Sequence, residues 1–303
     1  MKRTIESDME SAPAVQNRQK TVTVWILGGL GNQLFQYATG YALAMQTNAR
    51  LLVDVSEFQG YARKLALESL GTVLETTTTP DWARGYRRLW GRIEKRWRAQ
   101  TRRWYEKERS FHWYELPQSG WESLYLKGYW QSPKYFESVA ETLRGQWDLS
   151  RFQDPSLDET VKEIQRPGSV SVHIRRGDYA TNPAATATHG LLEKEYYDRA
   201  VRLIQAMVPQ SHFHVFSDDP AEASKIAHGW KNVTVHPSRS QEQDLWLMSS
   251  CQHKILANST FSWWGAWLSR RSGEIIAPRK WFARPRLLRT PVDDLYPEGW
   301  ILL

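Results

Sequence analysis

A strand, a glycine-rich loop, a helix and a second strand follow one another between residues 21 and 55. Val22, Val24 and Ile26 alternate with other residues in TVTVWIL, which predicts a strand over 21–27. The loop Gly28-Gly29-Leu30-Gly31-Asn32 leads into a helical pattern over 33–46, and a second strand is predicted over 49–55. Because a strand-helix-strand unit places its strands parallel, the first part of the chain is constrained to an α/β fold.

The second half of the chain repeats this alternation. Strands are predicted at 169–174, 212–216, 232–236, 253–257 and 274–278, with helices at 191–208, 243–250 and 261–268 between them. The polar stretch 148–159 and the break Arg166-Pro167-Gly168 place a domain boundary between about 148 and 168. We therefore expect two doubly wound domains, 21–155 and 168–303. Residues 1–20 are polar, lack the apolar centre of a secretion signal and are predicted to be a disordered leader.

Polar side chains follow three of the strands in the second half. They are Arg175 and Arg176, then Ser217, Asp218 and Asp219, and finally Asn258, Ser259 and Thr260. The carboxyl ends of parallel strands meet at one sheet edge, so the three groups can converge. An arginine fork and free amides at a helix start favour a diphosphate, and the two aspartates could accept hydrogen bonds from a ribose or a guanine edge. Taken alone, R-R-G-D is also typical of a surface turn.

The composition of the chain and the absence of certain motifs narrow the range of possible functions. The 303 residues carry a formal net charge of +7, which favours an anionic partner. The dinucleotide-binding fingerprint fails because Leu34 stands at its third glycine, although Asp54 lies where the ribose-binding acid would be. The chain has neither an Asp-x-Asp pair nor a Gly-Lys-Ser/Thr phosphate loop. Its one cysteine excludes an internal disulfide and a cysteine metal cage, and no apolar segment is long enough to cross a bilayer.

Residues 81–109 are basic and rich in tryptophan. Their aromatic residues recur roughly at helical spacing, which predicts a helical insertion in the first domain. We favour a solvated helix that rests its tryptophans on the core. The alternatives are a helix lying on an anionic membrane surface, or a nucleic-acid patch, for which no accompanying signature is present.

Four motifs in this order resemble the inverting, mainly bacterial α-1,2-fucosyltransferases that use GDP-fucose. The motifs are GGLGNQLFQYA at 28–38, HIRRGDY at 173–179, FSDD at 216–219 and NSTFSWWGAWL at 258–268. The resemblance implies a GT-B fold, in which two Rossmann-like domains face a cleft. It also implies that no metal or other cofactor is required, and a cytoplasmic location, often peripheral at the inner face of the membrane.

The resemblance also implies roles for individual residues. Arg175, helped by His173, would hold the β-phosphate. By its place in the sequence alone, Asp178 is the nearest candidate base, unless it only orients the arginines. The donor pocket would be formed by Arg175, Arg176, Ser217, Asp218, Asp219, Asn258, Ser259, Thr260, Phe261 and Ser262. The acceptor side of the cleft would contain Gly29, Gly31, Asn32 and Gln33. We expect Trp263, Trp264 and Trp267 to pack the helix rather than to bind sugar.

The expected activity is transfer of L-fucose from GDP-fucose to the 2-hydroxyl of a terminal β-galactoside, with inversion. One alternative is a fucosyltransferase of other linkage, such as a protein O-fucosyltransferase or a chitooligosaccharide α-1,6-fucosyltransferase; those share the arginine motif but not the NSTFSWWGAWL string. The other is a non-enzymatic basic protein that binds RNA or a membrane. On the favoured interpretation the partners are GDP-fucose and a β-galactoside glycan, with an anionic membrane as a peripheral contact and without nucleic acid.

Overall fold

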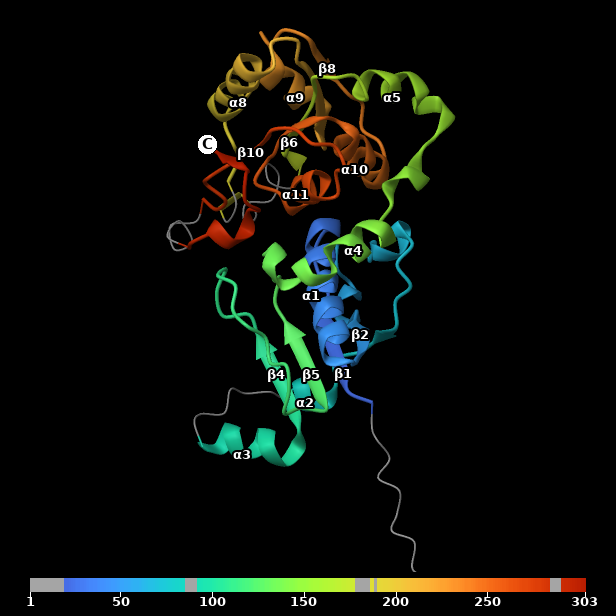
Figure 1. Ribbon diagram of the computed structural model, residues 1–303, viewed down its shortest axis with the longest axis vertical. Helices are drawn as coiled ribbons and strands as arrows, with labels where there is room; N and C mark the ends of the chain where they lie inside the picture. The colour runs from blue at the N-terminus through green and yellow to red at the C-terminus, as the bar shows by residue number, and fades with distance from the viewer. Residues whose placement is uncertain (1–18, 85–91, 178–185, 188–189, 284–289) are drawn as a thin grey trace, which may run out of the picture.

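The computed structural model describes residues 19–84, 92–177, 186–187, 190–283 and 290–303. Two α/β domains stack along the long axis of the molecule (Figure 1). Residues 1–18 of the predicted leader over 1–20, residues 85–91 of the basic segment and Asp178 lie outside the described residues.

The first domain contains a five-stranded parallel sheet in the order β3-β2-β1-β5-β4. Its strands are β1 (Thr21–Trp25), β2 (Arg50–Asp54), β3 (Thr76–Thr77), β4 (Arg103–Lys107) and β5 (Ser123–Lys127). Helix α1 (Leu30–Thr47) joins β1 to β2, so the strand-helix-strand prediction is confirmed. The Asp54 carboxylate accepts hydrogen bonds from the hydroxyls of Tyr125 and Thr79, at 2.5 and 2.6 Å, and thus ties strands together.

The basic segment does not form the continuous helix that was predicted over 81–109. It contains α2 (Asp81–Arg84) and α3 (Arg92–Thr101), and then β4, which pairs with β5 along its whole length. The helix ends where Arg102 adopts a left-handed φ of 52°. Tyr105 then stacks on Tyr125, with ring centroids 5.4 Å apart, and this cross-strand contact favours the sheet over a further helical turn.

The described tryptophans of this segment pack inward. Trp82 lies 6.3 Å from Trp97 and 6.4 Å from Tyr125, measured between ring centroids. The Arg98 guanidinium lies 5.0 Å from the centre of the Trp104 ring. These contacts support the interpretation in which the tryptophans rest on the domain.

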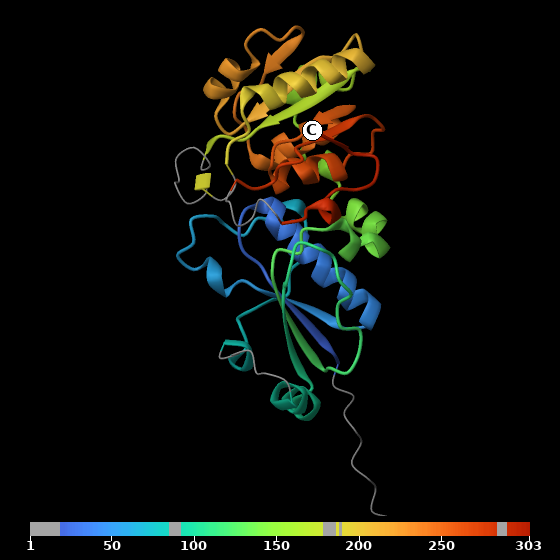
Figure 2. The same cartoon turned by 90° about the vertical axis from the view of Figure 1, so that its left-hand side faces the viewer.

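The second domain contains a six-stranded parallel sheet in the order β11-β10-β9-β6-β7-β8. Its strands are β6 (Ser169–Ile174), β7 (His212–Ser217), β8 (Val233–Val235), β9 (His253–Ile255), β10 (Ile275–Ala277) and β11 (Ile301–Leu302). Its helices are α5 (Asp158–Ile164), α8 (Lys194–Met207), α9 (Pro220–Ala227), α10 (Gln241–Ser250) and α11 (Thr260–Trp267). Helix α8 lies across one face of this sheet (Figure 2). The α/β class with two doubly wound parallel sheets is confirmed.

The connection between the domains consists of short helices. They are the 3₁₀ turns Pro133–Tyr135 and Glu137–Val139, helix α4 (Ala140–Gln146), and the turns Leu149–Phe152 and Pro155–Leu157. The turn Leu149–Phe152 and helix α5 both pack on α10. Residues 149–164 therefore pack with the second domain, within the predicted boundary region of 148–168.

Helices α1 and α11 join the two domains (Figure 1). The Trp264 indole Nε1 donates to the Gly31 carbonyl at 2.9 Å, and the Thr260 hydroxyl donates to Asn32 Oδ1 at 3.0 Å. Trp263 packs against Phe35 of α1 with ring centroids 4.5 Å apart. Trp263, Trp264 and Trp267 are all buried, so their predicted packing role is confirmed. One apolar core thus runs from domain to domain and fixes the geometry of the space between them.

Candidate functional site

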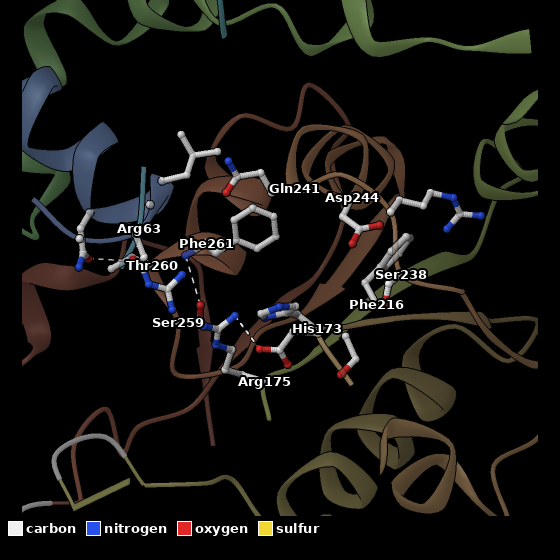
Figure 3. Close-up of a pocket in the computed structure, with 18 of the residues that line it drawn as sticks. Arg63, His173, Arg175, Phe216, Ser238, Gln241, Asp244, Ser259, Thr260 and Phe261 are labelled. Carbon is white, nitrogen blue, oxygen red and sulfur yellow. Dashed lines mark hydrogen bonds and ion pairs between the residues drawn. The ribbon is translucent and has the colours of Figure 1, made fainter. Parts of the chain in front are cut away.

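A cavity of about 500 Å³ lies between the two domains. On the side of the second domain, the neighbouring strands β9, β6 and β7 end at it and deliver Ser259, Arg175 and Asp218. On the side of the first domain, the β1–α1 loop delivers residues 28–32. The predicted convergence of three strand ends is thus present in the structure (Figure 3).

Arg175 is held in the cavity by a carboxylate. Its Nη1 forms an ion pair with Asp218 Oδ2 at 2.7 Å, while Asp218 Oδ1 accepts a hydrogen bond from the Arg176 backbone amide at 2.8 Å. A Cβ added at Gly177 would lie 2.2 Å from Asp218 Oδ2, so only glycine leaves room for this carboxylate. The guanidinium therefore enters the cavity from a fixed position.

Two helix N-termini face the same cavity. Ser259 caps α11 by accepting a hydrogen bond from the Phe261 amide, and the first residues of α1 line the opposite wall. Helix α1 has no acidic residue in its first turn and no side-chain cap at Gly29. Since helix N-termini carry partial positive charge, and since Arg63, Arg175 and Arg239 line the cavity as well, its chemistry suits an anion with several oxygens.

His173 lies beneath this anion-binding wall. The side chain is buried, its ring centroid lies 5.6 Å from that of Phe261, and Nδ1 has no hydrogen-bond partner among the described residues. Burial, and then the charge of Arg175, lower the pKa of His173 to about 3. The imidazole is therefore neutral at neutral pH and leaves a buried polar atom for a bound molecule to satisfy.

Most of the predicted site residues line the cavity. They are Gly29, Gly31, Asn32, His173, Arg175, Ser217, Asp218, Ser259, Thr260 and Phe261. Asp178 lies outside the described residues.

Five predicted residues point elsewhere. Gln33 is buried and donates to the carbonyls of Gly28 and Lys64, so the prediction that it faces the cleft is wrong. Arg176 is buried and donates through Nη2 to the Leu192 carbonyl.

The other three are Asp219, Asn258 and Ser262, and each bonds to backbone. Asp219 caps α9 through the Glu222 amide, Asn258 donates to the carbonyls of Gly190 and Trp281, and Ser262 donates to those of Ala257 and Ser259. These three side chains stabilise the backbone around the cavity and do not line it.

The structure adds lining residues that the motifs did not indicate. They are Gly28, Leu30, Tyr61, Arg63, Tyr129, Phe216, Ser238, Arg239, Gln241 and Asp244. The group from Ser238 to Asp244 follows β8, the next strand of the same sheet, so the strand-end argument could have found it. Burial raises the pKa of Asp244 to about 6 against the opposing charge of Arg239, and Asp244 Oδ1 has no hydrogen-bond partner in the described part of the chain.

Two more histidines are buried near Phe216: His214 on β7 and His236 directly after β8. His214 Nδ1 lies 3.1 Å from His236 Nε2, and the His236 ring stacks on Phe216 with ring centroids 4.8 Å apart. Burial first, and neighbouring positive groups second, lower the pKa of His214 to about 3 and that of His236 to about 4. With His173, three histidines are thus kept neutral inside the fold.

These histidines predict a loss of stability in mild acid. A histidine whose folded pKa is depressed takes up a proton more readily when unfolded, so its contribution is lost as pH falls below about 6.5. Each of the three lowers the free energy of unfolding by about 1.4 kcal/mol per pH unit there, and the raised pKa of Asp244 offsets one of them below about pH 6. Urea unfolding between about pH 6.5 and 4.5 should show His236→Gln falling less steeply than wild type, by about 1.4 kcal/mol per pH unit. Equal slopes in the two proteins would contradict the assignment.

The described residues contain neither a metal site nor a membrane-spanning helix. No group of three or more His, Cys, Asp or Glu side chains within them is arranged to hold a metal ion. None of the helices that the structure describes combines the length and the apolar character needed to span a bilayer.

Two parallel-sheet domains that enclose a cationic cavity define a GT-B-type transferase. Residues 4–303 match the model of glycosyl transferase family 11, and the chain belongs to that family. It is 34% identical to an α-1,2-colitosyltransferase of Escherichia coli, over 92% of this chain and 98% of the relative. It is 30% identical to the O-antigen biosynthesis glycosyltransferase WbnK of Escherichia coli, over 88% and 97% of the two chains.

More distant similarities extend to eukaryotic proteins. The chain is 23% identical to the mouse galactoside 2-α-L-fucosyltransferase Sec1, over 85% of this chain and 67% of the relative. Its fold resembles that of Arabidopsis thaliana FUT1 in complex with GDP, with a TM-score of 0.50 at 16% identity, over 94% of this chain and 76% of that one. The protein is thus a glycosyltransferase of family 11.

Proposed function

We propose that the protein transfers L-fucose from GDP-fucose to the 2-hydroxyl of a terminal β-galactoside, with inversion at the fucose anomeric carbon. The observation that carries this proposal is Arg175, fixed by Asp218 at the end of β6 beside the N-termini of α1 and α11. The names of the α-1,2-transferases among the relatives support the linkage. A cavity that gathers this much positive charge suits a diphosphate leaving group.

The cavity offers separate places for the diphosphate and for the guanine ring of the nucleotide. The diphosphate fits against Arg175 and the amides near Ser259 and Thr260. Asp244 and Phe216 are drawn apart from Thr260 in Figure 3, toward the other side of the cavity. A carboxylate accepts hydrogen bonds from the N–H groups of a guanine edge, and an aromatic ring packs against its flat face. We therefore assign the guanine to the end that Asp244 and Phe216 line.

The chemistry follows from the charges. The bond between the fucose anomeric carbon and the β-phosphate oxygen breaks, and its electron pair goes to the phosphate. The guanidinium of Arg175 meets that charge, and a fixed donor in such a position contributes about 3 kcal/mol at the transition state. The acceptor 2-hydroxyl attacks the opposite face of the sugar and loses its proton. Asp178 is the candidate base, by its place in the sequence alone.

An acceptor panel tests the proposal directly. The purified protein is incubated with GDP-fucose and a set of β-galactosides, and the linkage of each product is determined by NMR. An α-1,2-linked fucosyl galactoside is the expected product. A product of another linkage would favour the other fucosyltransferase classes. Failure of GDP to raise the melting temperature would favour a non-enzymatic RNA- or membrane-binding protein.

A second candidate function differs only in the sugar that is transferred. The E. coli relative at 34% identity is an α-1,2-colitosyltransferase, which favours a colitosyl donor as the alternative. The two donors can be compared at equal concentration with the same acceptor, since the ratio of their kcat/KM values measures the preference. A higher kcat/KM with the colitosyl donor would replace fucose in the proposal.

We propose that no metal ion takes part in the transfer. Arg63, Arg175 and Arg239 line the cavity, and guanidinium groups can neutralise a diphosphate without a divalent ion. Turnover should therefore continue unchanged in excess EDTA. Loss of turnover in EDTA that manganese restores would defeat this prediction.

The basic segment around α3 suggests a peripheral membrane contact. Arg96, Arg102, Arg103 and Lys107 are exposed there, whereas the tryptophans Trp97 and Trp104 are partly covered. Binding through these charges should require anionic lipid and should weaken as salt screens them. Co-sedimentation with anionic and neutral vesicles at two salt concentrations measures this. Equal binding to both kinds of vesicle, or binding to neither, would leave the segment with its packing role alone.

A further inference from the structure

The first-domain wall of the cavity presents two tyrosine rings, those of Tyr61 and Tyr129, beside the guanidinium of Arg63. The wall that faces it carries the charged groups of Arg175, Asp218 and Asp244, together with the rings of Phe216 and Phe261. Tyr61 and Tyr129 are 41% and 38% exposed. Among the exposed large hydrophobic side chains of the described residues, they are the ones that line the cavity.

The backbone of Tyr129 is held in place from behind. Glu108 accepts hydrogen bonds from the amides of Tyr129 and Trp130, at 2.8 and 2.9 Å. Gly128 permits this close approach, because a Cβ there would lie 2.3 Å from Glu108 Cβ. Trp25 then packs against the Tyr129 ring edge to face, with centroids 5.9 Å apart. The ring is therefore presented to the cavity in a fixed orientation, although more than a third of it is open to solvent.

A different loop brings Tyr61 to the same cavity. Its ring packs edge to face on Phe58, with centroids 6.1 Å apart, and its amide donates to the Phe58 carbonyl at 3.0 Å. Burial, and then the charges of Tyr61, Glu108 and Glu57, raise the pKa of Tyr129. Tyr129 thus keeps its hydroxyl proton at neutral pH and can donate as well as accept a hydrogen bond.

This pairing of rings and hydroxyls suits a neutral sugar. The C–H face of a pyranose packs on an aromatic face, and its hydroxyls exchange hydrogen bonds with phenols. A diphosphate or a carboxylate would gain hydrogen bonds from the phenols but no packing against the ring faces. The proposed position of the guanine is at the other end of the cavity, which Asp244 lines.

We propose that Tyr61 and Tyr129 form the binding surface for the pyranose ring of the acceptor, with Glu108 as the positioning residue for Tyr129. The assignment rests on the proposed transfer of a sugar to a glycan. It commits the acceptor to a neutral hexopyranoside that enters on the first-domain side of the cavity, opposite Arg175. Acceptor selectivity then depends on the Tyr61 and Tyr129 loops, which belong to neither the arginine motif nor the α11 motif.

The experiment separates acceptor binding from nucleotide binding. Tyr61→Ala and Tyr129→Ala are compared with wild type for the KM of a β-galactoside, for kcat, and for GDP affinity by calorimetry. We expect the acceptor KM to rise about tenfold or more in each variant, while GDP affinity stays within about twofold of wild type. Tyr129→Phe keeps the ring and should show a smaller rise. Trp113→Ala is the matched control, because Trp113 is an equally exposed aromatic residue outside the cavity lining.

Three outcomes of the kinetic and calorimetric measurements overturn the assignment. They are an unchanged acceptor KM in both alanine variants, a loss of GDP affinity as large as the rise in KM, and a rise of the same size in Trp113→Ala. Ligand-observed NMR of the galactoside with the GDP-bound protein adds a readout that needs no turnover. The wild-type protein could bind the galactoside, and the tyrosine variants could lose that binding, even if no sugar is transferred. That result would support this surface and reject the proposed function. No binding to the wild-type protein at all would reject the surface.

Discussion

Arg175→Lys is expected to lower kcat by roughly two orders of magnitude or more, while GDP affinity falls much less. Lysine keeps the positive charge but replaces a planar fork with a compact and more strongly hydrated ammonium. In the structure one arm of that fork is engaged with Asp218 at 2.7 Å. The ammonium of lysine lacks the planar, two-armed geometry that would hold the carboxylate and a phosphate oxygen in fixed positions. The loss falls mainly on kcat because the negative charge on the phosphate grows as the sugar departs.

GDP should still bind to this variant through the amides at the starts of α11 and α1. Arg175→Ala should lower kcat further, and it also leaves Asp218 without its partner. Folding of each variant is therefore checked by its thermal unfolding. The measurements are kcat with GDP-fucose and a galactoside, and GDP binding by calorimetry. Arg102→Lys is the matched control, because Arg102 pairs with Glu122 at 3.0 Å on the surface, outside the cavity lining. A kcat near wild type in Arg175→Ala would show that Arg175 does not stabilise the leaving phosphate.

Local sequence patterns predicted the parts of the fold that depend on local periodicity. The alternation of apolar residues in β6 and the helical spacing in α1 are properties of a few neighbouring residues, and both elements are present. Convergence of the strand ends followed as well, because parallel strands of one sheet end at the same edge. Arg175, Asp218 and Ser259 therefore meet in the cavity as expected.

Sequence proximity could not decide which way each side chain points. Arg175 and Arg176 are adjacent, yet one lines the cavity and the other is buried against the Leu192 carbonyl. Asn32 and Gln33 differ in the same way, since successive residues of a helix lie about 100° apart around its axis. A run of polar residues in a motif therefore overstates the number of residues that can touch a ligand.

Three side chains of the first-domain wall were missed for another reason. Tyr61, Arg63 and Tyr129 stand in loops that have no periodicity and no motif, and only the packing of the two domains brings them to the cavity. The strand β4 was mistaken for helix because Trp104 and Tyr105 continue the aromatic spacing of α3. Pairing with β5, a contact between residues distant in sequence, decides that segment.

Gly31→Ala is expected to disturb the cavity from a position that carries no side chain. A Cβ at Gly31 would lie 2.4 Å from the carbonyl carbon of Thr260 and 2.6 Å from the Phe261 amide nitrogen. Both atoms belong to the backbone of α11, which is packed in the shared core and cannot move aside as a flexible side chain could. The domains must therefore shift apart at the contact that Trp264 closes through its hydrogen bond to the Gly31 carbonyl.

We expect this shift to lower the free energy of unfolding by about 1–3 kcal/mol, the usual cost of overpacking. It should also lower kcat/KM by about 100-fold, because a displacement near 1 Å between reacting groups has that effect. Gly145→Ala is the matched control: it makes the same substitution within helix α4, where a Cβ has no neighbour within 4 Å, and should leave activity unchanged. Urea unfolding and kcat/KM are measured for both variants. If Gly31→Ala matched Gly145→Ala in both measurements, the two domains would tolerate separation at this contact, and the rigid placement of Arg175 against the α1 wall would not be needed for transfer.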